Sequence, residues 1–163
     1  MRDRVTNLRQ TATERGQAMV EFMLTVVFLT LLIVGIVEMF GFIYTYNVMA
    51  NAAKEGVRYA IVHGSNSSSA SGPSPSVAAS TPPCTASNNN NSSAANVVSQ
   101  TQNFAGFSMH DTSAVSVYVC YLDGNNNLNS IVQVTVSYEF RPLFGLGWPS
   151  ATINANSAGR IVF

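Results

Sequence analysis

The chain has 163 residues, a formal net charge of zero and only 10% charged residues, against 47% hydrophobic residues. Ordinary soluble domains carry about 25% charged residues, and in this chain the hydrophobic residues are unevenly placed. The lysines and arginines are few and scattered, which excludes a nucleic-acid groove. The length suits one domain with appendages.

The charges are ordered along the chain. Residues 1–16 carry four arginines and two acids, a net charge of +2, whereas residues 17–163 carry four cations and six acids, a net charge of −2. Residues 1–16 have no apolar core, and we interpret them as a leader peptide. Because basic flanks stay on the cytoplasmic side of a membrane, we expect the N-terminus in the cytoplasm and the bulk of the chain outside it.

A long apolar helix follows the leader. Phe22 to Ile43 spans 22 residues, roughly 33 Å at 1.5 Å per residue, which matches the hydrocarbon thickness of a bilayer. Glu38 is the one charge inside this stretch. We predict a transmembrane helix over residues 17–45, within a helix that runs on to residue 63.

Beyond the span the helix becomes amphipathic, and we predict that residues 46–62 cover a sheet. Tyr44 and Tyr46 suit a membrane–water interface. The charged side chains that follow lie largely off the apolar face, as the helical period requires. That face consists of Met49, Ala52, Ala53, Val57, Ala60 and Ile61.

Residues 64–95 are rich in serine, asparagine and proline and cannot bury enough apolar surface to fold alone. We therefore expect a disordered loop there. Apolar residues at helical spacing then predict a short amphipathic helix over residues 94–107, with Ser92 or Ser93 as its N-cap. Its expected apolar face is formed by Val97, Val98, Thr101 and Phe104.

After this helix the period of the apolar residues becomes two, which predicts strands. Valines alternate with other residues over 115–121 and again over 132–140, and Asp123-Gly124-Asn125 between the two runs marks a turn. A weaker third strand is expected over residues 151–163. The predicted fold class is therefore α+β: a long N-terminal transmembrane helix continues into an amphipathic half that packs on a small antiparallel sheet of about three strands.

Two cysteines, Cys84 and Cys120, lie in the predicted extracytoplasmic domain, residues 46–163. An even number of cysteines in an oxidising compartment favours a disulfide. A bond between them would close a loop of roughly 37 residues, worth on the order of 4 kcal/mol in the chain-entropy model. Two unrelated thiols are the alternative.

A lone acid marks the start of the apolar helix. Glu21 lies five positions after Gly16, and no charge follows it from Phe22 to Val37. A carboxylate at the mouth of a membrane helix is expensive to insert in lipid, which indicates a partner for it; the alternative is a side chain that snorkels to the interface without one. Glu38 is a second candidate for an intramembrane contact, unless it marks the exit of the helix.

These segments resemble the TadE-like proteins, which are minor pseudopilins of bacterial tight-adherence (Flp) pili. The resemblance implies that a prepilin peptidase cuts between Gly16 and Gln17. It also implies that Glu21 and Phe22 serve assembly, with Glu21 neutralising the N-terminal amine of a neighbouring subunit. Phe22 departs from the tyrosine that many pilins of this system carry. The residues that carry the resemblance are 16–22, 52–60 and 132–143.

The resemblance further implies a function and a location. The expected role is a minor pilin, single-pass in the bacterial cytoplasmic (inner) membrane, that assembles through its N-terminal helix to prime or tip a pilus. The implied partners are the prepilin peptidase, other pilins and pseudopilins of the same system, the inner-membrane assembly platform and the lipid bilayer. Two alternatives stay open: the main subunit of its own filament, and a membrane-tethered extracellular binding module.

The sequence shows no arrangement typical of an enzyme, and we expect neither a metal site nor a cofactor. The hairpin tip resembles a calcium loop, but Leu128 and Val134 stand where an EF-hand needs glycine and a bidentate acid. We therefore favour a polar tip. Its alternating polar residues are Asp123, Asn125, Asn127 and Asn129.

The loop after the second strand is apolar. We expect it to plug the end of the core, and a contact with another subunit or with the membrane surface is the alternative. Its large apolar residues are Leu143, Phe144, Leu146 and Trp148.

Overall fold

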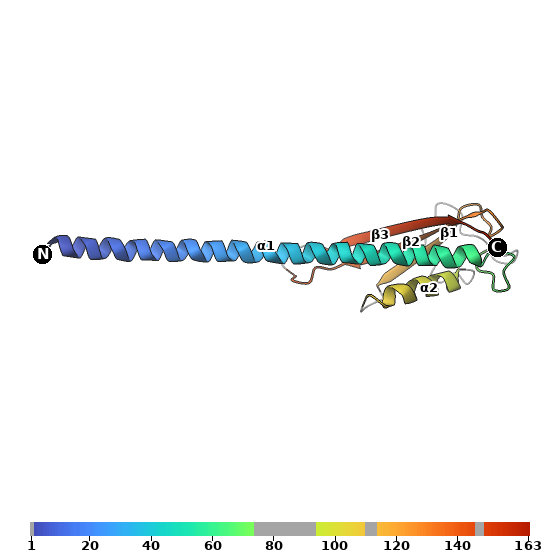
Figure 1. Cartoon of the computed structure of the whole chain (residues 1–163), viewed down its shortest axis with the longest axis horizontal. Coiled ribbons are helices and arrows are strands. Elements are labelled where there is room, and N and C mark those ends of the chain that lie inside the picture. The colour runs from blue at the N-terminus through green and yellow to red at the C-terminus, as the bar shows by residue number, and fades with distance from the viewer. Residues whose placement is uncertain (1, 74–93, 110–113, 146–148) are drawn as a thin grey trace. The chain divides into compact units, whose positions relative to one another are not determined.

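The computed structural model describes residues 2–73, 94–109, 114–145 and 149–163, with side chains from residue 16 onward. The chain forms two compact units, Met1–Gly41 and Phe42–Phe163. A long N-terminal apolar helix is followed by a short helix and a three-stranded antiparallel sheet, which confirms the predicted α+β class (Figure 1). The elements are α1 (Arg2–Val62), α2 (Ala95–Gly106), β1 (Val115–Tyr121), β2 (Ile131–Phe140) and β3 (Ala151–Arg160).

Helix α1 begins earlier than the sequence predicts. It starts at Arg2 and therefore includes the segment interpreted as a leader outside the fold. That segment contains leucine, arginine, glutamine and alanine, which are good helix formers, so the backbone continues upstream of Gly16. The helix ends at Val62, one residue before the predicted end at residue 63. From Gly16 to Val62 it is long and apolar enough to cross a membrane, by length and composition.

The sheet of the second unit has the order β1-β2-β3, with both pairs antiparallel. Val117 pairs with Val136, and Val136 pairs with Ala155, so one face carries apolar side chains across all three strands. Because side chains alternate along a strand, the period-two pattern of the sequence fixes this register. The valines at 115, 117, 119, 132, 134 and 136 are all buried.

The outer half of α1 covers this apolar face, as predicted. Met49, Ala52 and Ala53 are fully buried. A Cβ atom placed on Gly159 of β3 would lie 2.7 Å from Val57 Cγ1. The small residues on this side of the helix therefore let the helix and the sheet approach closely, and the packing is set by shape as well as by apolar area.

Helix α2 begins without the predicted cap. Its N-cap is Ala94, which makes no side-chain hydrogen bond, so the prediction of Ser92 or Ser93 is wrong; Ala94 is itself buried in the core. The predicted apolar face is right at Val97, Val98 and Thr101. Phe104 is instead 37% exposed, and Ala105 next to it is buried.

Gly56 marks the point where α1 meets α2 and the sheet. A Cβ atom on Gly56 would overlap Thr101 Oγ1 and would lie 3.2 Å from Val134 Cγ1. Thr101 is held in place because its hydroxyl donates to the carbonyl of Val97 at 2.8 Å. Glycine at position 56 therefore permits a close contact between three elements.

Tyr121 anchors the segment that follows α1. Its hydroxyl donates to the carbonyl of Ser71 at 3.0 Å, and its ring leaves no room for a side chain on Gly72, whose φ is +126°. Burial raises the pKa of Tyr121 to about 12 from 10.0, an effect larger than that of its hydrogen bond to Ser71. Residues 64–73, expected to begin a disordered loop, instead form turns, one of which is bonded from Ser65 N to Asn126 O at 2.9 Å. Residues 74–93 lie outside the described residues.

Replacing Gly56 with alanine should destabilise the second unit. Overpacking against Thr101 costs about 1–3 kcal/mol, which outweighs the gain in helix propensity of about 1 kcal/mol. Urea unfolding of the full chain in detergent micelles, followed by near-ultraviolet circular dichroism, measures the change. Gly16→Ala is the matched control, because a Cβ atom there meets nothing within 4 Å. Equal stability of the two variants would contradict the proposed contact.

The buried Tyr121 predicts a loss of stability at alkaline pH. The unfolded chain releases the Tyr121 proton near pH 10.0, while the folded chain keeps it until about pH 12. The free energy of unfolding should therefore be unaffected by this group below pH 10 and should fall by roughly 3 kcal/mol between pH 10 and 12.

Tyr121→Phe tests this expectation. The variant should be less stable near neutral pH by about 1 kcal/mol, because the hydrogen bond to Ser71 is lost. Its stability should then fall less steeply above pH 10 than that of the parent chain. Identical alkaline slopes in urea unfolding would show that Tyr121 is not protected by burial.

Candidate assembly site on the first helix

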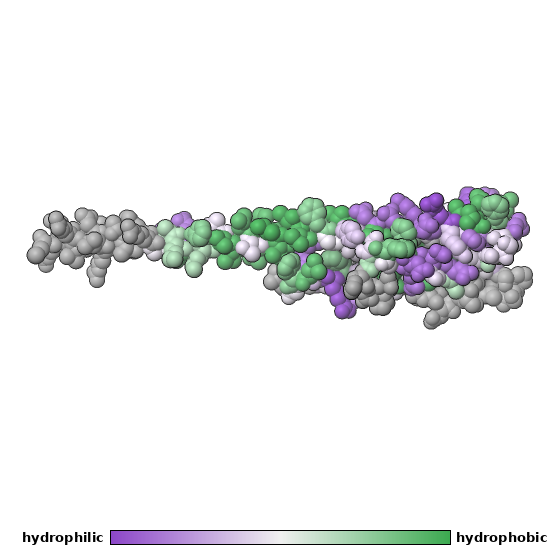
Figure 2. Space-filling view, turned by 60° about the horizontal axis from the view of Figure 1, so that its bottom comes forward, coloured by the Kyte–Doolittle hydropathy of each residue, from purple (hydrophilic) through white to green (hydrophobic). Residues whose placement is uncertain are grey.

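Helix α1 presents an apolar surface on all sides between Gln17 and Val37. Phe22 and Leu24 are 69% and 68% exposed, and the most apolar window of the helix has no buried residue. On the face visible in Figure 2, hydrophobic residues cover this stretch. A surface helix of a soluble protein buries one apolar stripe and shows a polar face, whereas a helix that is apolar all round lies in a membrane or a protein core. This surface is therefore suited to lipid or to neighbouring helices.

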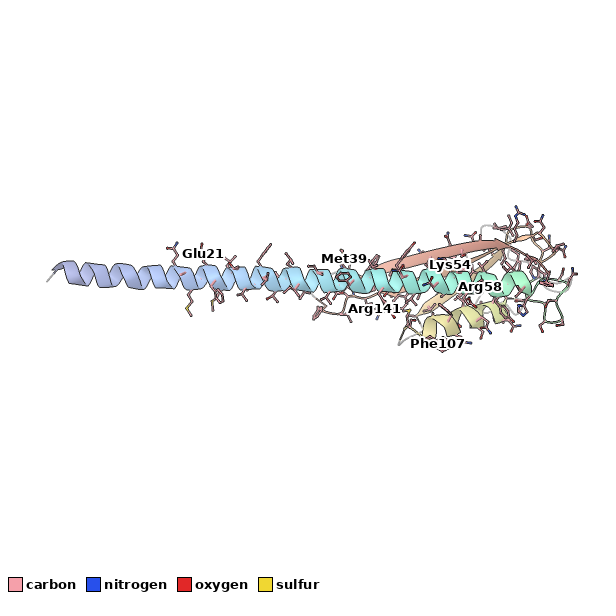
Figure 3. All side chains as sticks on the ribbon, viewed as in Figure 1. Glu21, Met39, Lys54, Arg58, Phe107 and Arg141 are labelled. Atoms are coloured by element: carbon pink, nitrogen blue, oxygen red, sulfur yellow. The ribbon has the colours of Figure 1, made fainter. Side chains whose placement is uncertain are left out.

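Glu21 is the single charge between Gln17 and Val37. Its side chain is exposed on the shaft of α1 (Figure 3). The ion pairs among the described side chains both lie in the second unit and do not involve it. An ionised carboxylate that lacks a partner is costly in an apolar environment. The described part of the chain thus supplies the charge but not its counter-ion.

The other polar side chains of this stretch differ from Glu21 because the helix itself satisfies them. Thr25 donates its hydroxyl to the carbonyl of Glu21 at 2.8 Å. Thr30 donates in the same way to the carbonyl of Val26, also at 2.8 Å. Such bonds to the carbonyl four residues earlier let hydroxyl groups sit in an apolar medium. The carboxylate is the group here that still needs a partner.

Gly16 has no packing role in the described structure. A Cβ atom built on it meets nothing within 4 Å, and its φ is not in the left-handed region. At Gly56 and Gly72, by contrast, a side chain would overlap a neighbour. Glycine inside a helix is less favourable than alanine by about 1 kcal/mol. Folding therefore gives no reason for glycine at position 16.

Gln17 and Glu21 lie four residues apart on α1 and so share one face of the helix. Along the axis the two positions differ by roughly 6 Å, or one turn. An α-amine created at Gln17 would lie about one turn from this carboxylate. The structure thus places the predicted processing site and the predicted assembly residue next to each other, with Phe22 exposed beside them.

The remaining predicted site residues lie elsewhere. Glu38 is 4% exposed, although Val37 and Met39 beside it are 42% and 60% exposed; its role as an intramembrane contact stays a prediction. Cys120 is buried in β1. Cys84 lies outside the described residues, and the disulfide between them stays a prediction.

The apolar loop after β2 does not plug the core where it is described. Leu143 is 76% and Phe144 is 54% exposed, so the expected core role is wrong for these two residues. The strands already fill the core with their own valines. Leu146 and Trp148 lie outside the described residues.

The polar side chains of the hairpin tip form hydrogen bonds within the turn itself. Asp123 Oδ2 accepts a hydrogen bond from the backbone N–H of Ile131 at 2.8 Å. Asn125 Oδ1 accepts one from the Ser130 hydroxyl at 2.6 Å. These oxygens therefore hold the turn, and the described residues include no cluster of histidine, cysteine, aspartate or glutamate that could hold a metal ion.

Sequence reasoning missed Phe107, which follows α2 and is 90% exposed. Ala105, two residues earlier and inside α2, is fully buried. Side-chain exposure therefore changes within two positions at the end of the helix. An apolar residue one place beyond a helix is a weak signal in a sequence. Only the three-dimensional position shows that it faces solvent.

The lipid-length helix that continues into a helix-covered antiparallel sheet is a pilin-like arrangement. Residues 16–58 match the family model of the TadE-like proteins. This match confirms the resemblance over α1, from the predicted processing glycine to the amphipathic half, and it is consistent with a TadE-like protein of the Tad system. No curated protein and no solved structure matches the chain. The match and the apolar helix together indicate a membrane-anchored protein associated with the Tad pilus.

Proposed function

We propose that the protein is a minor pilin, or pseudopilin, that is held in the bacterial inner membrane by α1 and assembles through this helix to prime or tip a Tad pilus. The observation that carries the proposal is Glu21, a single exposed charge on an apolar helix surface just after Gly16. In a simple membrane anchor such a charge would only oppose insertion. In a subunit that packs against other helices inside the membrane, the same charge can pair with an opposite charge on a neighbour.

Processing at Gly16 gives the glycine a purpose that folding does not. The proposed prepilin peptidase cuts between Gly16 and Gln17 at the cytoplasmic face of the membrane. Glycine has no side chain to obstruct the approach of the peptidase to the scissile bond. No described atom lies within 4 Å of the position that a Cβ atom on Gly16 would take. The cut removes the basic leader and creates an ammonium group at Gln17.

The new ammonium group is the proposed partner of Glu21 in a neighbouring subunit. Two opposite charges held together in an apolar medium are far less costly than either one alone, and removal of one member of a buried pair costs about 3–5 kcal/mol. Because the amine sits at the end of its helix, pairing with Glu21 of another subunit also sets the axial stagger between the two helices. The apolar surface around Glu21 then packs in the same bundle.

The match to TadE-like proteins supports the minor role, and abundance tests it. A priming or tip subunit should be present in trace amounts in sheared surface fibres, and its deletion should reduce the number of fibres. A chain that makes up most of the fibre mass would be the main subunit of its own filament instead.

Gly16→Leu should block processing. Leucine is a good helix former and meets no described atom at this position, so the helix should persist while the scissile bond becomes obstructed. A denaturing gel of membrane fractions should show one longer species in place of the parent band. Proteolytic resistance of the second unit is the control for folding. A band of unchanged length would count against processing at this bond.

Glu21→Gln should leave the protein processed and in the membrane but should lower its incorporation into fibres. A lost pair of about 3–5 kcal/mol corresponds to a fall of roughly 100-fold or more. Immunoblots of sheared fibres against membranes give the ratio.

Glu55→Gln is the matched control for this test. Glu55 is an acid on the same helix that pairs with Arg58 at 3.4 Å on the surface, and such pairs are worth about 0–1 kcal/mol. The control should assemble normally. If Glu21→Gln also assembles normally, the carboxylate has no pairing role.

A further inference from the structure

Exposed apolar side chains gather at the end of the second unit where α1 begins within it. Phe107 and Leu143 are 90% and 76% exposed, values far above those of the core. The tyrosines on α1 nearby are also exposed. We define the collar as Tyr44, Tyr46, Phe107, Leu143 and Phe144.

One side of the collar is held by α2. The hydroxyl of Tyr44 donates to the carbonyl of Ser108 at 3.3 Å, which places the end of α2 beside the first turns of α1 in this unit. The helical path continues for one more turn past α2, because Met109 N donates to Ala105 O at 2.9 Å. Phe107 lies in this turn, next to Ser108, and Figure 3 shows it at the end of α2.

The other side of the collar is held by β2. Its final residue, Phe140, packs edge-to-face on Phe42 with ring centroids 5.5 Å apart. Its first residue, Ile131, pairs with Arg160, and the chain soon after Arg160 is bonded from Val162 N to Ile61 O at 2.9 Å. Strand β2 thus runs from the level of Ile61 to the level of Phe42. The chain beyond it, with Leu143, therefore starts at the end of this unit where Phe42 lies.

The level of the collar coincides with the expected surface of the bilayer. The uncharged run that starts at Phe22 reaches one hydrocarbon thickness, roughly 30 Å, near Phe42. Tyrosines two and four residues further on lie where aromatic rings favour the headgroup region. The charges of Arg141 and Glu139, close to Leu143 in the sequence, offset each other, because the two side chains form an ion pair at 3.2 Å.

We infer that the collar rests on the outer leaflet of the membrane while the subunit awaits assembly, with Phe107 and Leu143 inserted at the headgroup–acyl boundary. Exposed apolar groups of this size mark a binding surface. This inference rests on the membrane anchorage in the proposed function, and it is independent of processing and of the Glu21 pair.

Tryptophan fluorescence in the full chain tests the inference. The single native tryptophan is removed by Trp148→Phe, and single reporters are introduced as Phe107→Trp or Leu143→Trp. The protein is placed in vesicles of phosphatidylcholine and phosphatidylglycerol, with and without brominated phosphatidylcholine, which quenches only reporters that touch acyl chains.

Two further reporters calibrate the measurement. Leu24 lies in the apolar helix, so Leu24→Trp reports membrane anchorage. Leu128 lies in the tip between β1 and β2, and Leu128→Trp places a reporter there. This tip is at the opposite end of the unit, because Asn129 N donates to Ile161 O at 2.8 Å and the next residue, Val162, is bonded to Ile61. Leu128 is 61% exposed, so it matches the collar residues in exposure but not in position.

The expected result is loss of emission in brominated vesicles at positions 107 and 143, closer to that at position 24 than to that at position 128. Quenching at 107 and 143 no stronger than at 128 would overturn the inference. So would protection from an aqueous quencher without lipid quenching, because another copy of the chain would then cover the collar. An unquenched reporter at 24 would overturn anchorage itself, and with it the proposed function.

Discussion

One carboxylate on an otherwise apolar helix surface is the constraint on which the account of this protein depends. Glu21 opposes insertion of α1 into lipid, and the described part of the chain offers it no cation. A partner from another molecule resolves this conflict. The proposed pairing would also give Gly16 a role, because cleavage after it would supply an amine at the membrane face, and it would give the exposed apolar surface a role as a contact between helices.

Helix α1 meets two different requirements along its length. Between Gln17 and Val37 no side chain is buried, and large apolar side chains there suit lipid or neighbouring helices. In the second unit it buries one face, and small residues such as Ala52, Ala53 and Gly56 let α2 and the sheet approach closely. Tyr44 and Tyr46 of the collar follow soon after the start of the second unit at Phe42. In the proposed function, the subunit keeps its assembly surface in the membrane and its folded unit outside it.

Local patterns in the sequence were enough to predict much of this fold. The alternating valines of β1 and β2 specify their register, and the spacing of Met49, Ala52 and Ala53 predicts the face of α1 that is buried. Features that depend on distant contacts were not predictable in this way. The order of residues 64–73 depends on Tyr121, about fifty positions along the chain from its partner Ser71. The exposure of Leu143 depends on how the strands fill the core. For the candidate site the sequence supplied Gly16 and Glu21, and the structure added that no fold contact requires glycine at position 16.

A zero-length carbodiimide crosslink in sheared fibres tests the central claim most directly. After a cut before Gln17, the amines of the chain are its N-terminus and Lys54, so the products are few and mass spectrometry can assign them. We predict an amide that joins Glu21 to the N-terminal residue of another subunit, either a second copy or a companion pilin. A chain that begins at Met1 in the fibre, or a Glu21 that stays unmodified while Lys54 reacts, would contradict the account.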